Sequence, residues 1–154
     1  MARIQKDRFS QVAALPFRVR KGQVEVLLVT SRETKRWLIP KGWPIKGKKA
    51  HKAAAQEAME EAGVKGTVAQ NAIGHYDYWK RRAEHFDLCR VQVYPLQVSK
   101  QLKKWPEKGE RDSRWFGVEE AAQQVLEPAL AALIRTLPLH VQMIPEPALP
   151  ALVE

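Results

Sequence analysis

"KAAAQEAMEEAGV" spans residues 52–64 and places three glutamates, Glu57, Glu60 and Glu61, within an alanine-rich segment. Strong helix formers fill residues 50–62, and Gly63 follows where a glycine commonly ends a helix, so the segment predicts an α-helix over 50–62. Residues three and four apart share a helix face, so all three carboxylates project from one side, which we expect to face solvent. Like charges at this spacing destabilise a helix by a few tenths of a kcal/mol per pair. The pattern fits either a solvated acidic face or a site where a cation relieves the repulsion, and we favour the cation.

The loop before this helix supports the cation interpretation. It reads "KGWPIKGKK" over residues 41–49, and its Gly42 allows the backbone to approach a ligand closely. Lys41 and Lys48 bring ammonium groups beside the carboxylates. Mg²⁺ typically binds a few carboxylates together with substrate phosphates, and lysines neutralise the remaining phosphate oxygens. The loop and helix therefore predict a metal and phosphate site.

The segments around this helix alternate between strands and helices. Two β-rich segments around Lys21-Gly22 predict a hairpin, and a proline at residue 128 predicts a break or kink in the last helix. The order indicates an α+β fold with a mixed sheet packed between helices. We expect strands over 11–19, 23–31, 36–40, 66–79, 85–98 and 113–118, a basic turn over 80–84, and a second helix over 118–137.

Composition limits the class of protein. The chain has 154 residues, enough for one domain, and a formal charge of +9, which favours a polyanionic partner. No apolar run reaches the roughly 18–20 residues of a membrane span. The single cysteine, Cys89, cannot form an internal disulfide, so we expect a reducing compartment, the cytoplasm. Whether the chain forms a homodimer stays open.

Residues 42–64 resemble the Nudix box, whose pattern is Gly, five residues, Glu, seven residues, Arg-Glu-hydrophobic-x-Glu-Glu-x-Gly-hydrophobic. "RWLIPKG" (36–42), "EEAGVKGTV" (60–68) and "RWFGVEEA" (114–121) are similar to the diphosphoinositol polyphosphate phosphohydrolase-like branch of the Nudix hydrolase superfamily. The resemblance covers residues 10 to about 137. It implies a Nudix fold, an α/β/α sandwich, with a single domain over 1–137 and a proline-rich tail over 138–154 that we expect to be extended.

The resemblance also implies an enzyme that hydrolyses diphosphate linkages with Mg²⁺ or Mn²⁺. By position in the box, Glu57 and Glu61 would be the principal metal ligands, Glu60 would complete the cluster, and the Gly42 carbonyl would be a further ligand. All three glutamates are candidate catalytic residues. The general base is expected to be one of them, with Glu110 outside the box as the second candidate.

Two positions depart from the box. Lys48 replaces its first glutamate, and Gln56 replaces its arginine. Gln56 precedes Glu60 by four residues, so its amide can still hydrogen-bond that carboxylate. If positions 48 and 56 face each other, an arginine at 56 would be repelled by Lys48, which makes the two changes mutually tolerable. Loss of an orienting charge typically lowers metal affinity or activity roughly 10–100-fold.

Basic residues that match the family's positions favour a substrate with many phosphates, such as a diphosphoinositol polyphosphate or a dinucleoside polyphosphate. The aromatic segment at 75–79 fits a half-buried strand better than a base-stacking site. A protein that binds a phosphorylated ligand without turnover and an enzyme acting on RNA 5′ ends are the alternatives. Neither a nucleic-acid-binding module nor a membrane partner is expected. The candidate substrate-binding residues are Arg32, Arg36, Lys41, Lys48, Arg81, Arg82, His85 and Arg111.

Overall fold

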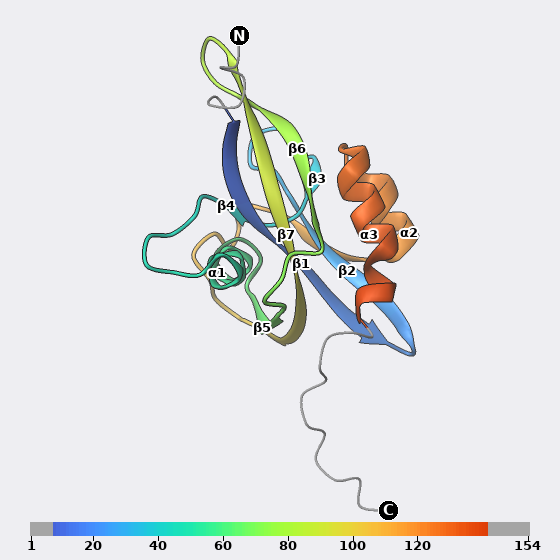
Figure 1. Ribbon diagram of the computed structural model, residues 1–154. Coiled ribbons are helices and arrows are strands. Elements are labelled where there is room, and N and C mark those ends of the chain that lie inside the picture. The colour runs from blue at the N-terminus through green and yellow to red at the C-terminus, as the bar shows by residue number, and fades with distance from the viewer. Residues whose placement is uncertain (1–7, 142–154) are drawn as a thin grey trace, which may run out of the picture.

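The computed structural model describes residues 8–141 and has an eight-stranded mixed sheet between helices (Figure 1). Short strands flank the first helix, and the long first and seventh strands form the centre of the sheet. The elements are β1 (Arg8–Arg20), β2 (Gln23–Thr30), β3 (Trp37–Leu38), β4 (Lys41–Gly42), α1 (Ala50–Ala62), β5 (Val64–Val68), β6 (Gly74–Arg81), β7 (Phe86–Gln101), β8 (Ser113–Gly117), α2 (Val118–Gln124) and α3 (Pro128–Val141).

Strands β1 and β7 form the centre of the sheet. They run parallel over ten paired positions, from Arg8 opposite Leu88 to Phe17 opposite Gln97. The hairpin predicted from Lys21-Gly22 is confirmed, because β1 pairs antiparallel with β2 across this turn. Strand β4 also pairs with β1, and this pairing ties the start of the 43–49 loop to the centre of the sheet.

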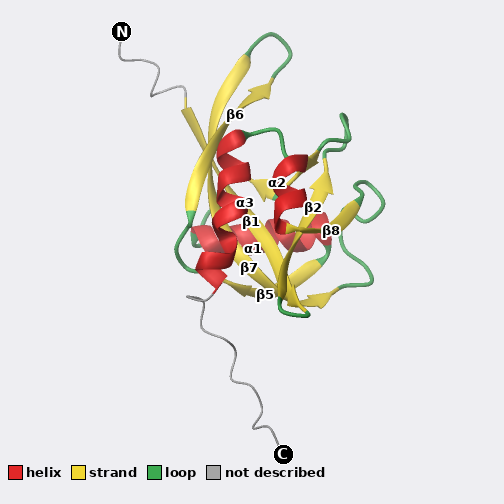
Figure 2. Ribbon diagram, turned by 90° about the vertical axis from the view of Figure 1, so that its right-hand side faces the viewer, coloured by secondary structure: helices red, strands yellow, loops and turns green. Residues whose placement is uncertain are grey.

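Helices cover both faces of the sheet. Side chains alternate between the two faces along each strand, and they form two separate hydrophobic cores. Ala14 and Leu96 belong to the core beneath α1, whereas Ala13 and Val93 belong to the core that packs against α2 and α3. Figure 2 shows α2 and α3 in front of the sheet and α1 behind it. The α+β fold with a sheet between helices is therefore confirmed.

Helix α1 has the bounds that the sequence predicts. It ends at Gly63, whose φ of 68° is left-handed and whose N–H donates to the Met59 carbonyl. Its buried face consists mainly of alanines, among them Ala54 and Ala58. Their small side chains let the helix lie close to the sheet.

Two predicted boundaries are wrong. The single strand expected over 66–79 is split into β5 and β6, which pair with different halves of β7. Pro95 of β7 has no N–H to donate, and the partner chain leaves the ladder there, between Val68 and Gly74. Helix α3 also continues through Pro138 to Val141, where an extended tail was expected. Residues 142–154 of that tail lie outside the described residues.

The last helical segment is interrupted as predicted. Helix α2 ends at Gln124, and Pro128 is the first residue of α3, a position that needs no backbone N–H. Over residues 8–141, no helix combines the length and the apolar character that a membrane crossing requires.

Candidate active site

Gly42 and Glu57 lie in direct contact at the edge of the sheet. Gly42 is opposite Val12 of β1, and the 43–49 loop leads from it into α1. A Cβ on residue 42 would collide with Cδ of Glu57. Only glycine therefore lets this carboxylate lie against the backbone of β4, as the family's pattern implies.

Glu57 and Glu61 form a carboxylate pair one helical turn apart, in which Glu61 is buried and Glu57 is half-buried. The expectation that these side chains face solvent is wrong for Glu61, which is only 7% exposed. Burial raises the pKa of Glu61 to about 8, and the neighbouring Glu57 charge adds to this rise while Arg111 opposes it. Burial also raises the pKa of Glu57, against a hydrogen bond with Glu61. A further cation between or beside the two carboxylates would favour their charged form.

Glu60 is oriented by a short hydrogen-bond chain on the outer side of α1. The Lys48 ammonium donates to Oε1 of Gln56 over 2.5 Å, and Nε2 of Gln56 donates to Oε2 of Glu60 over 2.8 Å. The hypothesis that positions 48 and 56 face each other is thus confirmed. We call this arrangement the Lys48–Gln56–Glu60 chain.

The loop over residues 102–112 closes against the end of α1. The Leu102 N–H donates to the Gly63 carbonyl, and the Glu107 N–H donates to the Glu60 carbonyl over 3.0 Å. These bonds bring two side chains, Glu107 and Arg111, to the buried carboxylates.

Arg111 is held by three partners. Its Nε donates to Glu107 over 2.8 Å, its Nη1 donates to the Thr30 carbonyl over 3.2 Å, and its Nη2 lies 3.9 Å from Glu61. The side chain is only 11% exposed. Sequence reasoning placed Arg111 among substrate ligands, and the structure adds that it partly neutralises Glu61.

Sequence reasoning missed Glu107. Its charge raises the pKa of both Glu57 and Glu61, so it lies within electrostatic reach of the pair. Glu110, the candidate that the sequence suggested, instead pairs with Arg32 over 3.3 Å at the surface. Only the four-residue spacing to Arg111, typical of an ion pair on one helical turn, could have pointed to Glu107.

Lys41 places positive charge within electrostatic reach of Glu61, and Arg36 lies within electrostatic reach of Lys41. Burial lowers the pKa of Lys41, and the Arg36 charge lowers it further while Glu61 opposes this effect. Arg36 binds Glu127 through Nη2 over 3.2 Å, but its buried Nη1 has no hydrogen-bond partner among residues 8–141. A buried donor without a partner is costly, and an anionic oxygen would satisfy it.

The remaining predicted cations lie at the end of the β6–β7 hairpin. Arg82 and His85 bind Asp87 over 2.7 and 3.0 Å, and Arg81 pairs with Phe86 across the hairpin. Figure 1 places this hairpin end well away from α1, and the side-chain hydrogen bonds given for Arg82 and His85 stay within the hairpin. Their part in substrate binding stays a prediction.

The carboxylate pair fits a divalent metal whose coordination is completed by other ligands. Over residues 8–141, no three Asp, Glu, His or Cys side chains are already arranged to hold a metal ion. Mg²⁺ usually takes one or two carboxylates and keeps water or substrate phosphates as its other ligands. Glu57 and Glu61, with their raised pKa values, supply that number of carboxylates.

Comparison with known proteins identifies the family of this chain. A family model described as the NUDIX domain matches residues 8–137. The chain belongs to the Nudix family. Nudix hydrolases generally use divalent metals, and the Nudix box of this chain is the segment from Gly42 to Val64.

Similar proteins include curated Nudix hydrolases and solved Nudix structures. Mitochondrial Nudix hydrolase 16 of Arabidopsis thaliana is 34% identical over 109 residues, which cover 68% of this chain and 60% of that protein. Diphosphoinositol polyphosphate phosphohydrolase 3-beta of Bos taurus is 31% identical over 133 residues, 84% of this chain and 77% of that protein. The crystal structure of C. elegans Ap4A hydrolase superposes with a TM-score of 0.63 at 18% identity, covering 86% of this chain and 98% of that one, and supports the fold. The chain thus spans about three fifths of the first of these relatives.

Proposed function

We propose that the protein is a Mg²⁺- or Mn²⁺-dependent hydrolase that cleaves a phosphoanhydride linkage in a polyphosphorylated small molecule. A diphosphoinositol polyphosphate and a dinucleoside polyphosphate are the two substrate types that fit. The observation that carries the proposal is the contact of Glu57 with Gly42 beside the buried Glu61. Burial raises the pKa of both carboxyl groups, and a divalent cation beside them would favour their charged form.

Each residue of the site has a role in this reaction. Glu57, Glu61 and the Gly42 carbonyl would hold the metal, which supplies charge stabilisation and an acidified water when bound. Water attacks one phosphorus, the bridging P–O bond breaks, and a box glutamate accepts the water proton. Lys41 and the unpartnered Nη1 of Arg36 would neutralise the departing phosphate.

The charge balance and the relatives support the substrate class. The net charge of +9 suits a ligand with several phosphates. One relative is named for diphosphoinositol polyphosphates, and a structural neighbour is named an Ap4A hydrolase. Removal of pyrophosphate from RNA 5′ ends is the alternative that would also use the basic surface. A reducing compartment such as the cytoplasm suits the buried free thiol of Cys89.

A catalytically weak binding protein is the other alternative, and its evidence is Lys48 and Gln56. The Lys48–Gln56–Glu60 chain argues against it, because Gln56 still orients Glu60 through a hydrogen bond. An uncharged partner holds a carboxylate less strongly than an arginine does. We therefore expect reduced turnover with the same chemistry.

The test is a substrate panel with matched glutamine variants. Purified protein is incubated with Mg²⁺ or Mn²⁺ and diadenosine polyphosphates, diphosphoinositol phosphates, nucleoside triphosphates, nucleotide sugars or 5′-triphosphorylated RNA. Glu61→Gln removes the buried carboxylate, whereas the control Glu119→Gln removes an exposed one on α2 that pairs with Arg135. Hydrolysis that survives in the control and disappears in Glu61→Gln supports the proposal. Equal turnover in both variants, or ligand binding without turnover, contradicts it.

A further inference from the structure

The aromatic ring of Trp105, in the 102–112 loop, packs against the glycine that ends α1. Gly63 is buried, and a Cβ on residue 63 would collide with the Trp105 ring. The ring therefore occupies the space that any larger side chain at 63 would need. Trp105 itself is half-buried and, within the described chain, belongs to neither of the two hydrophobic cores. Its contribution is thus to the end of α1 and not to the packing of helices on the sheet.

Gly63 meets two separate requirements at this position. Its φ of 68° is left-handed, a conformation that asparagine also adopts at helix ends. The contact with Trp105 is stricter, because it leaves no room for a Cβ. A substitution by asparagine therefore separates the two requirements: it tolerates the backbone conformation and displaces the ring.

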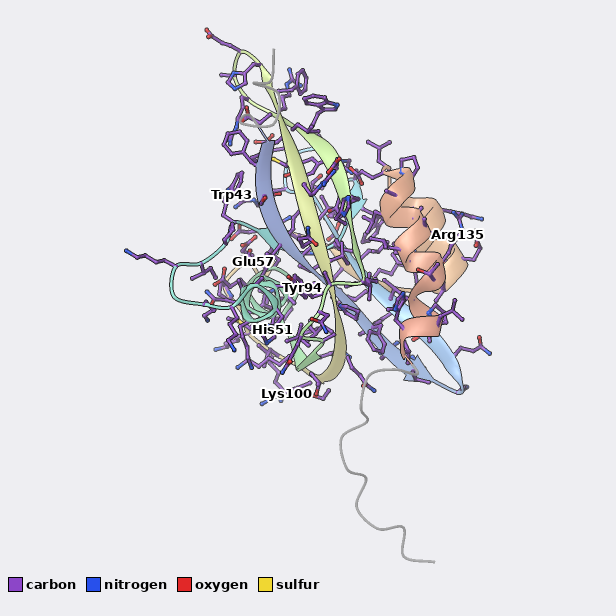
Figure 3. The ribbon with its side chains drawn as sticks, viewed as in Figure 1. Trp43, His51, Glu57, Tyr94, Lys100 and Arg135 are labelled. Carbon is purple, nitrogen blue, oxygen red and sulfur yellow. The ribbon has the colours of Figure 1, made fainter. Side chains whose placement is uncertain are left out.

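The ring lies between the two backbone bonds that dock the loop on α1. The Leu102 N–H donates to the Gly63 carbonyl over 2.7 Å, and the Glu107 N–H donates to the Glu60 carbonyl over 3.0 Å. Trp105 falls between Leu102 and Glu107 in the chain, so its contact with Gly63 fills the span between these two bonds. Figure 3 shows Lys100, which precedes the loop, on the side of the molecule that carries Glu57, opposite Arg135 of α3.

Short-range bonds connect Trp105 to the residues that follow it. The Lys108 N–H donates to the Trp105 carbonyl over 3.1 Å, and the Lys108 ammonium lies 5.3 Å from a Trp105 ring centroid. The Glu110 N–H donates to the Glu107 carbonyl over 3.0 Å. Residues 105–110 thus form two overlapping turns, so a displacement of Trp105 is passed on to Glu107.

Glu107 connects this part of the loop to the metal-binding carboxylates. It accepts a 2.8 Å hydrogen bond from Nε of Arg111, whose Nη2 lies 3.9 Å from Glu61. Arg111 is anchored separately by the Thr30 carbonyl, so we expect Glu107 to depend on Trp105 more than Arg111 does. A misplacement of about 1 Å at a catalytic site can lower the rate about 100-fold. A ring that fixes the position of Glu107 is therefore expected to affect the reaction without touching the substrate.

We propose that Trp105 is a positioning residue for the metal site: its ring, seated on Gly63, holds Glu107 beside the carboxylate pair of α1. This inference rests on the proposed hydrolase function and deepens it. Trp105 acts through Glu107, and glycine at 63 serves as the surface on which the ring is seated as well as the end of the helix.

Four variants and two matched controls test this role. Trp105→Ala removes the ring, Trp105→Phe keeps an aromatic ring, and Gly63→Asn displaces the ring while tolerating the backbone conformation. Glu107→Gln removes the carboxylate that the ring is proposed to position. Trp79→Ala removes an exposed tryptophan on β6, and Gly22→Asn places asparagine at a φ of 76° where a Cβ meets nothing within 4 Å. The controls measure the loss of a tryptophan and the left-handed conformation by themselves.

The position of the loop is measured first, by amide hydrogen exchange without divalent metal, so that no turnover is required. The Leu102 and Glu107 amides donate to α1 and should be protected in the wild type. Their exchange should be roughly 10-fold faster or more in Trp105→Ala and Gly63→Asn, because apolar contact that holds the loop closed is lost. It should stay at the wild-type rate in Trp105→Phe and both controls.

The consequence for the site is measured next, as kcat, KM and the Mg²⁺ affinity obtained from the metal-induced rise in melting temperature. Trp105→Ala should lower kcat or Mg²⁺ affinity about 10–100-fold, the effect typical of lost support around a metal site, with little change in KM. In the Glu107→Gln background the same change should cost less than about 3-fold, because residues that act as a unit are not additive. Gly63→Asn should likewise add less than about 3-fold to Trp105→Ala.

Three results would overturn the positioning role. They are equal exchange of the Glu107 amide in Trp105→Ala and Trp79→Ala, faster exchange with unchanged kcat and Mg²⁺ affinity, and fully multiplicative effects of Trp105→Ala and Glu107→Gln. If Trp105→Ala does not fold, Gly63→Asn carries the same comparisons against Gly22→Asn. Faster exchange and weaker Mg²⁺ binding in Trp105→Ala, with no turnover even in the wild type, would keep the positioning role and refute the hydrolase proposal.

Discussion

The Lys48–Gln56–Glu60 chain makes a sharp prediction about restoring the arginine of the Nudix box. Gln56→Arg would place a guanidinium where the amide now accepts a 2.5 Å hydrogen bond from Lys48. Two unit charges about 4 Å apart repel by about 1 kcal/mol in water and by about 4 kcal/mol at an effective dielectric constant of 20. Lys48 is exposed, so the smaller value applies, and its side chain can rotate away.

The gain from the same substitution is also small. The new guanidinium would replace a 2.8 Å amide hydrogen bond to Glu60 with an ion pair, and exposed ion pairs contribute about 0–1 kcal/mol. The energy gained from the ion pair with Glu60 and the energy lost to repulsion by Lys48 nearly cancel. We therefore expect Gln56→Arg alone to change kcat/KM by less than about 5-fold, because 1 kcal/mol corresponds to roughly that factor.

The double variant Lys48→Glu/Gln56→Arg should behave differently. A glutamate at 48 and Glu60 would then flank the new arginine and turn repulsion into attraction on both sides. Contacting residues couple by about 0.5–3 kcal/mol, so the double variant should exceed the product of the single effects by roughly 2-fold to 150-fold.

The assay is a double-mutant cycle on kcat/KM and on the apparent Mg²⁺ affinity, measured with the best substrate of the panel. Wild type, both single variants and the double variant are compared at one ionic strength, because salt screens exposed charges. A gain of 10-fold or more from Gln56→Arg alone, or strictly additive effects in the cycle, would refute the reasoning.

Three further predictions concern the buried carboxylates. Glu61→Gln should keep or raise the melting temperature without divalent metal, because burial already disfavours the charged form of Glu61, and should abolish the metal-induced rise in melting temperature. Gly42→Ala should weaken that metal-induced rise, since a Cβ there would displace the carboxylate packed against it; the control Gly117→Ala, where a Cβ meets nothing within 4 Å, should not. Glu107→Gln should lower metal affinity or kcat/KM about 10–100-fold, whereas Glu110→Gln should change them less than about 3-fold because its ion pair is exposed. An equal effect of the last two variants would show that Glu107 has no special place at the site.

Local patterns in the sequence predicted the parts of the structure that local forces determine. The bounds of α1 follow from helix propensity and the glycine at 63, and the common side of its glutamates follows from the helical period. The split between β5 and β6 has a signal as well, Pro95, but it lies in the partner strand more than twenty residues away.

Long-range contacts explain what sequence reasoning could not predict at the site. The burial of Glu61 depends on the 102–112 loop, which docks through bonds from Leu102 to Gly63 and from Glu107 to Glu60. No periodicity relates residue 107 to residue 60. The approach of Lys41 to Glu61 likewise depends on the pairing of β4 with β1. These contacts exist only once the sheet has formed.

The distribution of ion pairs argues that the carboxylate pair is kept for a ligand and not for stability. The exposed Glu119 has a 2.9 Å ion pair with Arg135. The buried Glu61 has its described cation partner only at 3.9 Å, and within residues 8–141 no ion pair to Glu57 is formed. A fold selected for stability alone would pair its most desolvated charges most closely, because unpaired buried charge is the most costly. In this protein the exposed Glu119 has the shorter ion pair and the buried Glu61 the longer one. Glu61 lies where β4, α1 and the 102–112 loop meet. This is the arrangement expected of a site that a divalent cation completes.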